Sequence, residues 1–525
     1  MKAMQIGRLE RYGIVGRAHL WIVTFAALST LVLSSPARSQ TWTAMAAGKA
    51  PTFNVGVALQ LTDGRILMQE NQTSNWYTLT PDKFSVYHNG TFTKVASFPA
   101  SMNYAPLYFA SAVLPDGRVI VEGGEDNKGV QDWTTKGAIY DPVKNTWTPV
   151  NPPKGWTNVG DAQSVVLSNG TFMLANYKNG ESALLNAKTL TWTVAAGLGK
   201  NDDNDEEGWT LLPDGNVLTV DTYVGFPSTY AGRNSEIYNP TSEIWGSAGD
   251  TQVRLWDSRI GCPTQTGGSA HETGPEVLVP TDDAEDMQVV AFGANTCTGQ
   301  AGHVSMYAVP FGIWVPGPNI PNGDDMADAP AALLLNGNIL IETNKGYGQT
   351  PATFYEFVSG GLGYTKVPSP PGYSGNSEGG RMLVTPEGTV LLTHVGTKNI
   401  WFYKGISSSY PASWRPTICS ACYPSTVTIG DTYKISGTQF NGLSQGAAFG
   451  DDAQSATNYP LVRIKNKASG EVFYARTHNF SSGVDTGTKT VSTEFDVLPG
   501  TQTGPSTLVV VVNGIPSEPV DITVK

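Results

Sequence analysis

The chain has 525 residues, 58 glycines, 34 prolines, only 15% charged residues and a formal net charge of -12. This length suits either one large domain with a small one or an array of repeats, and the many turn-forming residues favour an all-β protein over long helices. The acidic balance, without any run of Lys and Arg, argues against nucleic acid as a partner.

The first 39 residues have the pattern of an export signal. Basic residues precede an apolar run from Leu20 to Leu33, and small residues flank Arg38 where a signal peptidase would cut. The run is short for a membrane span. We therefore expect a secreted protein, extracellular or periplasmic, that begins near Gln40 and keeps no membrane span after cleavage; an uncleaved anchor is the alternative.

Residues 40–418 contain an internal repeat. A turn dipeptide ending in Gly lies between two short runs rich in Val, Leu and Ile, which is typical of a β-hairpin. The spacing of about fifty residues matches four-stranded propeller blades. One degenerate unit, His271 to Gly293, fills the single long gap, so the repeat predicts a seven-bladed β-propeller. The turns are Asp63-Gly64, Asp116-Gly117, Asn169-Gly170, Asp214-Gly215, Asn336-Gly337 and Glu387-Gly388.

A second marker keeps the same register as the turns. An apolar residue and a Trp recur with constant separation, and large rings of this kind fill the space between neighbouring blades. We predict that they belong to the core and bind no ligand. The pairs are Tyr140 with Trp147, Leu185 with Trp192, Tyr238 with Trp245 and Tyr307 with Trp314.

Beyond Pro416 the repeat stops. Short alternating strands from 423 to 525 predict a separate immunoglobulin-like β-sandwich. In an oxidising compartment the four cysteines suggest two local disulfides, Cys262 with Cys297 and Cys419 with Cys422. A redox or zinc role for the C-x-x-C pair is the alternative, although no second pair or neighbouring His accompanies it.

Two groups of residues resemble a known family. Gly123-Gly124, Tyr140-Asp141-Pro142 and Trp147 resemble kelch motifs, and the stretch from Gly450 to Ile464, followed by RTHNF, resembles the early-set, immunoglobulin-like domain that closes galactose oxidase and glyoxal oxidase. The resemblance implies a kelch-type propeller with that C-terminal domain. It also implies one axial copper ion held by two tyrosines, one of them crosslinked to a cysteine, and by two histidines.

This chain departs from that copper ligand set. In the turn register the crosslinking cysteine falls on Tyr108, its tyrosine partner on Asp161, and the consecutive tyrosine and histidine on Glu378 and Gly379. Only the histidine of the C-terminal domain has a counterpart, His478. We therefore expect no radical-copper site.

The same register places acidic residues at the start of the innermost strand of most blades. Carboxylates gathered around one axis repel each other, so some should have raised pKa values or a cation should lie among them. His271 adjoins Glu272, Arg381 follows Glu378, and the loop at His478 is expected to reach the channel. The axial positions are Asn54, Tyr108, Asp161, Asp205, Glu206, Glu272, Asp328 and Glu378.

Three interpretations of this ring stay open. The acids line a wet channel without chemistry; they hold a divalent cation, calcium or, with the two histidines, copper; or they act as acid and base as in glycoside hydrolysis. We assign catalytic roles to Asp161, Glu272 and Glu378, and metal binding to His271 and His478. Ligand binding is assigned to Tyr108, Asp205, Glu206, Asp328 and Arg381.

The first functional hypothesis is a carbohydrate-directed protein, enzyme or binder, whose acidic face, rimmed by Trp76, Trp133 and Trp156, contacts a sugar or other small-molecule ligand, or a cationic polymer. An oxidase with an altered copper site is the second hypothesis. The third is a non-catalytic surface or matrix protein that binds another protein and carries a structural cation.

Overall fold

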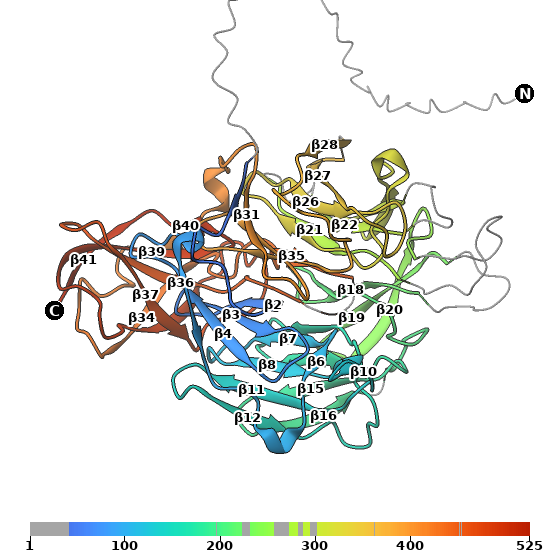
Figure 1. Ribbon diagram of the computed structural model, residues 1–525, viewed down its shortest axis with the longest axis horizontal. Helices are drawn as coiled ribbons and strands as arrows, with labels where there is room; N and C mark the ends of the chain where they lie inside the picture. The colour runs from blue at the N-terminus through green and yellow to red at the C-terminus, as the bar shows by residue number, and fades with distance from the viewer. Residues whose placement is uncertain are drawn as a thin grey trace, which may run out of the picture. The chain divides into compact units, whose positions relative to one another are not determined.

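Four-stranded antiparallel sheets make up most of the chain (Figure 1). The computed structural model describes residues 41–525 except 196, 223–231, 257–271, 282–286, 295–301, 362, 451 and 453. The predicted signal segment 1–39 and the predicted pair Cys262 and Cys297 lie outside these residues. No helix in the described part is long and apolar enough to cross a membrane. Its helices are single 3-10 turns: η1 (Tyr87–Asn89), η2 (Ala100–Met102), η4 (Pro321–Gly323) and η5 (Ala412–Trp414).

Local turn chemistry forms the hairpins that the repeat predicts. The six turn glycines have φ between 74° and 90°, a region that favours glycine. Preceding Asp side chains cap the turns: the backbone N–H of Arg65 donates to Asp63 Oδ1 at 3.1 Å, and that of Arg118 donates to Asp116 Oδ1 at 3.0 Å. The turns therefore fix the register of each hairpin.

The described part contains six repeat sheets of four strands and one of five, and six of these seven sheets take four of their strands from one stretch of the chain. The first three are β2 (Val55–Gln60), β3 (Ile66–Glu70), β4 (Trp76–Thr80) and β5 (Thr91–Lys94); β7 (Ala110–Val113), β8 (Val119–Glu122), β11 (Gly137–Asp141) and β12 (Thr146–Val150); and β13 (Ser164–Val166), β14 (Phe172–Ala175), β15 (Ser182–Asn186) and β16 (Thr191–Ala195). A small extra sheet joins β6 (Pro106–Leu107), β9 (Asp126–Asn127) and β10 (Val130–Gln131).

The next three sheets repeat this pattern. They are β17 (Thr210–Leu211), β18 (Val217–Val220), β19 (Asn234–Asn239) and β20 (Ile244–Asp250); β21 (Glu276–Val279), β22 (Gln288–Phe292), β23 (Val304–Ala308) and β24 (Ile313–Pro316); and β25 (Ala331–Leu333), β26 (Ile339–Thr343), β27 (Thr353–Val358) and β28 (Gly363–Val367). The β21 sheet is the predicted degenerate unit, and most of its expected turn lies outside the described residues.

The seventh sheet draws on both ends of the repeat. The first strand of the described chain, β1 (Thr41–Ala44), pairs antiparallel with β31 (Ile400–Lys404), which continues to β30 (Val390–His394) and β29 (Gly380–Val384). First strands of neighbouring sheets also touch: β2 contacts both β7 and β29, β7 contacts β13, and β21 contacts both β17 and β25. This arrangement is consistent with a propeller whose innermost strands surround an axis.

Nine further strands form the C-terminal part. Strand β37 pairs with β36 through its first half and with β38 through its second half, so one strand joins the two halves of the sheet. A separate core of Val, Ile and Phe side chains lies within it. The strands are β32 (Thr417–Ile418), β33 (Thr426–Val427), β34 (Thr432–Thr438), β36 (Leu461–Asn466), β37 (Val472–His478), β38 (Val491–Asp496), β39 (Gly504–Val512), β40 (Ile515–Pro516) and β41 (Val520–Val524).

One C-terminal strand lies apart from the others. The short strand β35 (Ala447–Ala448) pairs with β25 of the repeat region, and Figure 1 shows it beside β21 and β26, away from β34 and β41. The C-terminal part thus sends a segment among the first strands of the repeat sheets.

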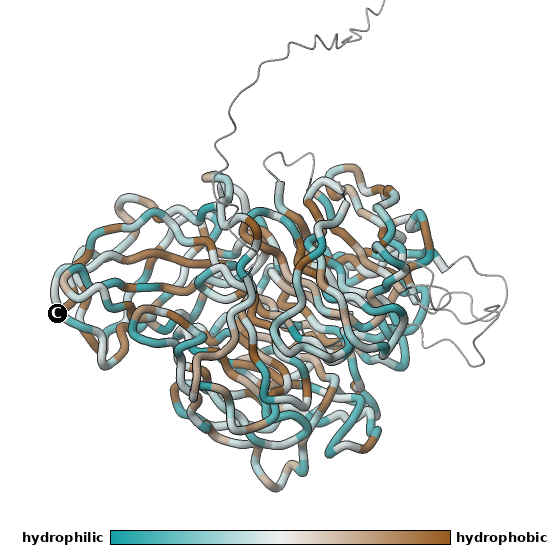
Figure 2. Tube along the Cα trace, turned by 45° about the horizontal axis from the view of Figure 1, so that its top comes forward, coloured by the Kyte–Doolittle hydropathy of each residue, from teal (hydrophilic) through white to brown (hydrophobic). Residues whose placement is uncertain are grey.

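Most of the predicted aromatic markers are core residues; Trp192 is half-buried and packs against the core. Tyr140 and Trp147 are direct cross-strand partners with ring centroids 5.1 Å apart, and the rings of Tyr238 and Trp245 lie 5.2 Å apart. All four are buried. Figure 2 shows hydrophobic stretches running through the strands while hydrophilic residues gather in the connecting loops. The core therefore extends through the repeat sheets and leaves the strand ends for polar residues.

Candidate functional site

In three of the repeat sheets, a residue just before the first strand has an unusual backbone conformation. Tyr108, Glu206 and Asp328 each stand nine positions before the turn glycine of their sheet, and have φ of 52°, 59° and 46°. Non-glycine residues in this region are strained by about 1 kcal/mol each and are held there by their surroundings. Strain repeated at one register position marks these strand starts as a candidate site.

Three predicted axial acids meet at this place. One carboxylate oxygen each from Glu206, Glu272 and Asp328 lies within 4.8 Å of the others, although the residues come from three different sheets. Glu272 hydrogen-bonds to both Glu206 and Asp328. Burial, followed by the charge of Glu272, raises the pKa of Glu206 well above its usual range. Burial, followed by the charge of Asp452, raises the pKa of Asp328 to about 8. The triad therefore retains a proton at neutral pH, since the pKa of Asp328 lies near 8.

Asp161 and Asp205 belong to the same acidic environment. Burial, followed by the charge of Asp205, raises the pKa of Asp161 well above its usual range, and the charge of Glu125 adds to this effect. Glu125 was not predicted; it precedes β9 in the small extra sheet. The acidic surface therefore extends from the triad towards the second and third sheets.

Hydroxyl and amide donors surround Glu378. The hydroxyls of Tyr108 and Tyr347 donate to its Oε1 at 3.3 Å and 3.2 Å, and Asn376 Nδ2 donates to its Oε2 at 3.4 Å. The charge of Glu378 in turn helps burial to raise the pKa of both tyrosines. Glu378 is therefore placed as a hydrogen-bond acceptor beside the triad, since its charge also raises the pKa of Asp328.

Arg381 is the cation of this environment. Its side chain is buried, and its Nη1 donates to the backbone oxygens of Glu378 at 2.6 Å and Gly380 at 2.7 Å. The guanidinium lies 3.9 Å from the ring centroid of Phe449 and 5.8 Å from that of Tyr108. Arg381 therefore holds the backbone of Glu378 and partly offsets the surrounding negative charge.

Phe449 belongs to an insertion segment, residues 445–459, that runs along the first strands of the repeat sheets. Gln445 Oε1 accepts the N–H of Leu211 at 2.8 Å, Gln454 Oε1 accepts the Ser164 hydroxyl at 3.2 Å, and the Tyr459 hydroxyl donates to Gln60 O at 2.5 Å. Together with the pairing of β35 and β25, these bonds fix the segment in the middle of the repeat region.

The insertion segment adds an acid that the turn register did not predict. Asp452 is buried, and burial raises its pKa to about 6, while the charge of Arg381 opposes that rise. Gly450 lies close to the triad, because a Cβ there would stand 2.8 Å from Asp328 Oδ1. The segment thus closes the acidic site from the C-terminal side.

His478 does not take the position expected for it. It lies on β37, where Nε2 is 3.0 Å from Asp496 Oδ1 and Nδ1 is 3.5 Å from Glu494 Oε2. The insertion segment, and not the loop at His478, reaches the acidic site, because its pairing with β25 carries it there. His271, the other predicted metal ligand, lies outside the described residues.

Cys419 and Cys422 are joined by a disulfide.

Two of the three tryptophans expected at the rim are core residues. Trp76 is fully buried and Trp156 is 8% exposed, because both are packed within hydrophobic clusters. Trp133 is half-buried and stacks on Tyr177, with ring centroids 5.8 Å apart and planes 8° apart. Burial, followed by the charges of Asp205 and Asp161, raises the pKa of Tyr177 to about 12, so this aromatic pair adjoins the acids.

Sequence reasoning missed Tyr347, Phe449 and Asp452. Phe449 adjoins, and Asp452 lies within, the stretch that carries the resemblance to the oxidase C-terminal domain, so that stretch was a usable signal. Tyr347 follows β26 in a loop outside the repeat register and carries no sequence signal.

The donors of the site are carboxylate and phenol oxygens. Such ligands suit hard cations, whereas the copper ligand set implied by the resemblance needs two imidazoles. None of the described histidines belongs to the carboxylate triad or contacts Glu378 by hydrogen bond. The described residues therefore do not fit that copper site.

No protein-family model matches the chain. Among curated proteins it is similar to Kelch-like protein terF of Aspergillus terreus, with 25% identity over 182 residues that cover 30% of this chain and 36% of that protein. The chain thus matches about a third of the length of that relative.

Solved structures show further similarity. One is a fungal alcohol oxidase of the AA5 family in complex with copper, with 15% identity, a TM-score of 0.49, and coverage of 93% of this chain and 99% of that chain. Another is a catalytically inactive virginiamycin B lyase from Staphylococcus aureus with quinupristin, with 9% identity, a TM-score of 0.46, and coverage of 70% of this chain and 99% of that chain. The chain is thus similar to a kelch-like protein and, in structure, to a copper alcohol oxidase.

Proposed function

We propose that the protein is a secreted, seven-bladed kelch-type propeller with an immunoglobulin-like C-terminal domain, and that it binds and processes a carbohydrate at the acidic site. The Cys419–Cys422 disulfide supports export, because disulfides persist in oxidising compartments. The closure of the seventh sheet by β1 supports the propeller.

The proposal rests on the meeting of Glu206, Glu272 and Asp328 beside Glu378. A carboxyl group that stays protonated at pH 7 beside a carboxylate is the arrangement that glycoside hydrolysis requires. Asp328, whose pKa is about 8, is the proton donor to the leaving oxygen. Glu378, oriented by the hydroxyls of Tyr108 and Tyr347, is the acceptor that activates water or attacks the sugar carbon. No step passes through copper.

Residues around this pair recognise the sugar. Asp161 and Asp205 present carboxyl oxygens to hydroxyl groups, and the stacked rings of Trp133 and Tyr177 offer a flat apolar face next to them. Glu272, hydrogen-bonded to both Glu206 and Asp328, keeps the shared proton within the triad.

Binding to a polysaccharide array, followed by assay of new reducing ends, tests this function. Glu378→Gln and Asp328→Asn should each lower turnover by about 100-fold or more, because each removes a group that transfers a proton. Glu518→Gln, a carboxylate that is 79% exposed on the C-terminal part, is the matched control. Wild-type turnover in both site variants would refute the assignment.

A divalent cation in the triad is a second candidate, for a non-catalytic interaction protein. Three carboxylate oxygens within 4.8 Å can bind one Ca²⁺. Calcium would then raise the melting temperature of the wild type by more than that of Asp328→Asn, and no polysaccharide would be cleaved. Cleavage without added calcium would exclude this candidate.

A further inference from the structure

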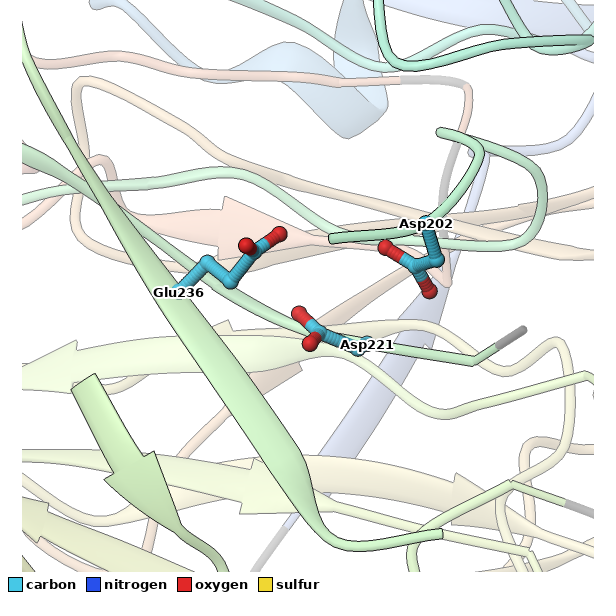
Figure 3. Close-up of side chains that lie close together, drawn as sticks. All are labelled: Asp202, Asp221 and Glu236. Atoms are coloured by element: carbon cyan, nitrogen blue, oxygen red, sulfur yellow. The ribbon is translucent and has the colours of Figure 1, made fainter. Parts of the chain in front are cut away.

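We propose that the chain has a calcium site separate from the acidic site, formed by Asp202, Asp221 and Glu236 (Figure 3). One oxygen from each of these carboxylates lies within 4.8 Å of the others. Two oxygens bound to one Ca²⁺ are at most about 4.6–5.2 Å apart, because each Ca–O distance is about 2.3–2.6 Å. The spacing of these oxygens is therefore compatible with one bound Ca²⁺.

Three parts of the fourth sheet bring these groups together. Asp202 lies in the loop between β16 and β17, Asp221 directly follows β18, and Glu236 lies on β19 at an irregularity in its pairing with β20. Figure 3 shows the three carboxylates directed towards a common space. Such bulges re-aim side chains, which places Glu236 beside Asp221.

Asp221 is the residue that points to a ligand. It is fully buried, and neither of its carboxylate oxygens accepts a hydrogen bond from an N–H or hydroxyl group of the described residues, while the carboxyl group of Glu236 lies within hydrogen-bond reach. A buried carboxylate without a donor is costly unless it is protonated or bound to a cation. Without an ion, burial raises the pKa of Asp221 to about 9, so that the carboxyl group is protonated at neutral pH.

Lys200 does not neutralise the cluster by itself. Its Nζ lies 2.5 Å from Asp202 Oδ1 and 2.8 Å from Glu236 Oε2, and it also contacts Glu207 at 2.8 Å. Four carboxylates, Asp221 included, therefore face one ammonium group, an excess of three negative charges when all are ionised. A divalent cation reduces that excess to one.

The proposed calcium site is connected to the acidic site through the chain segment 202–207. The segment 202–207 supplies Asp202 and Glu207 to this cluster and Asp205 and Glu206 to the acidic site, and the Thr222 hydroxyl donates to Asp205 O at 2.6 Å. A bound ion would therefore fix the segment that positions Asp205 and Glu206. The calcium site does not depend on the proposed carbohydrate function.

Terbium luminescence gives a reading specific to this site. The ring of Trp245 lies 5.5 Å from Lys200 Nζ, so Tb³⁺ bound here should emit when tryptophan is excited. Chelator-treated protein is titrated with TbCl3, and CaCl2 should displace the signal. Asp221→Asn and Asp202→Asn should each weaken binding by about 100-fold. Trp245→Phe should weaken the emission yet keep calcium-induced thermal stabilisation, since the ring of Trp209, 5.7 Å from that of Trp245, remains.

Asp328→Asn is the control that separates the two acidic clusters, and it should keep the emission. Emission that persists in both Asp221→Asn and Asp202→Asn, or that disappears only in Asp328→Asn, would overturn the proposal. Equal stabilisation by MgCl2 and CaCl2 would overturn the choice of calcium. Absence of polysaccharide cleavage would affect only the carbohydrate function.

Discussion

The guanidinium of Arg381, on β29, lies 3.9 Å from the ring centroid of Phe449, in the segment inserted from the C-terminal part. Both side chains are buried, and Arg381 also holds the backbone oxygen of Glu378. This contact joins the repeat region, the insertion segment and the acidic site, so the C-terminal part contributes to the site and is more than a spacer.

Removal of the Phe449 ring should destabilise the protein. Phe449→Ala should lower the free energy of unfolding by about 3–5 kcal/mol, as expected for a buried aromatic. Phe449→Leu should cost less, because it keeps most of the apolar volume. Its remaining cost is the lost cation–π contact, worth about 0.5–2 kcal/mol. Urea unfolding measures both. Phe311→Ala, at a side chain 64% exposed, should change stability by less than about 0.5 kcal/mol; equal effects at the two positions would contradict the buried contact.

Gly450→Ala tests the close approach of the insertion segment to the triad. Its Cβ would stand 2.8 Å from Asp328 Oδ1, so the carboxylate or the segment must move, at a cost of about 1–3 kcal/mol. Gly246→Ala is the matched control, because its Cβ meets no atom within 4 Å. Thermal unfolding should separate the two variants. Identical melting temperatures would show that the segment does not lie against Asp328.

Stability should fall as pH rises from about 4 to 9. A carboxyl group whose folded pKa exceeds its unfolded pKa contributes stability that is present below the unfolded pKa and lost as pH rises through the folded pKa. Asp328 and Glu276, each with a pKa raised to about 8, and Asp221, raised to about 9, are such groups. Melting curves across this range should show the decline in chelator-treated protein. Asp328→Asn should make this decline shallower. A melting temperature that is highest above pH 8 would contradict the prediction.

Lys200→Met should be strongly destabilising. It leaves Asp202, Glu207 and Glu236 buried without their cation, and breaking a buried ion pair in this way costs about 3–5 kcal/mol. The loss should be larger at pH 9 than at pH 6, because fewer of the carboxyl groups hold protons there. Lys188→Met, at an exposed lysine, is the control for urea unfolding. A loss independent of pH would indicate packing and not charge.

Tyr347→Phe should weaken the chemistry assigned to Glu378. It removes one of the two hydroxyl donors to Glu378 Oε1, a change worth about 1–3 kcal/mol, or roughly tenfold to hundredfold in turnover. Tyr433→Phe removes a comparable hydroxyl that faces solvent on the C-terminal part and should leave turnover unchanged. An equal loss in both variants would point to a general effect on folding.

The turn dipeptides and aromatic markers determined the repeat from the sequence alone. These features are local: an Asp-Gly turn sets its own hairpin, and Tyr140 meets Trp147 within the same sheet. Register counted from the turns also located Glu206, Glu272 and Asp328, because equivalent positions of repeated sheets lie at the same edge.

Tertiary structure decided the rest, since contacts between distant segments leave no periodic pattern. The C-terminal part brings Asp452 to the surroundings of Arg381, whereas His478 stays on β37, because β35 pairs with β25 and carries its own segment there. Trp76 and Trp156 are buried by neighbouring sheets that the sequence does not identify. Lys200 gathers carboxylates from the loop before β17 and from β19, a convergence that exists only once the fourth sheet has formed.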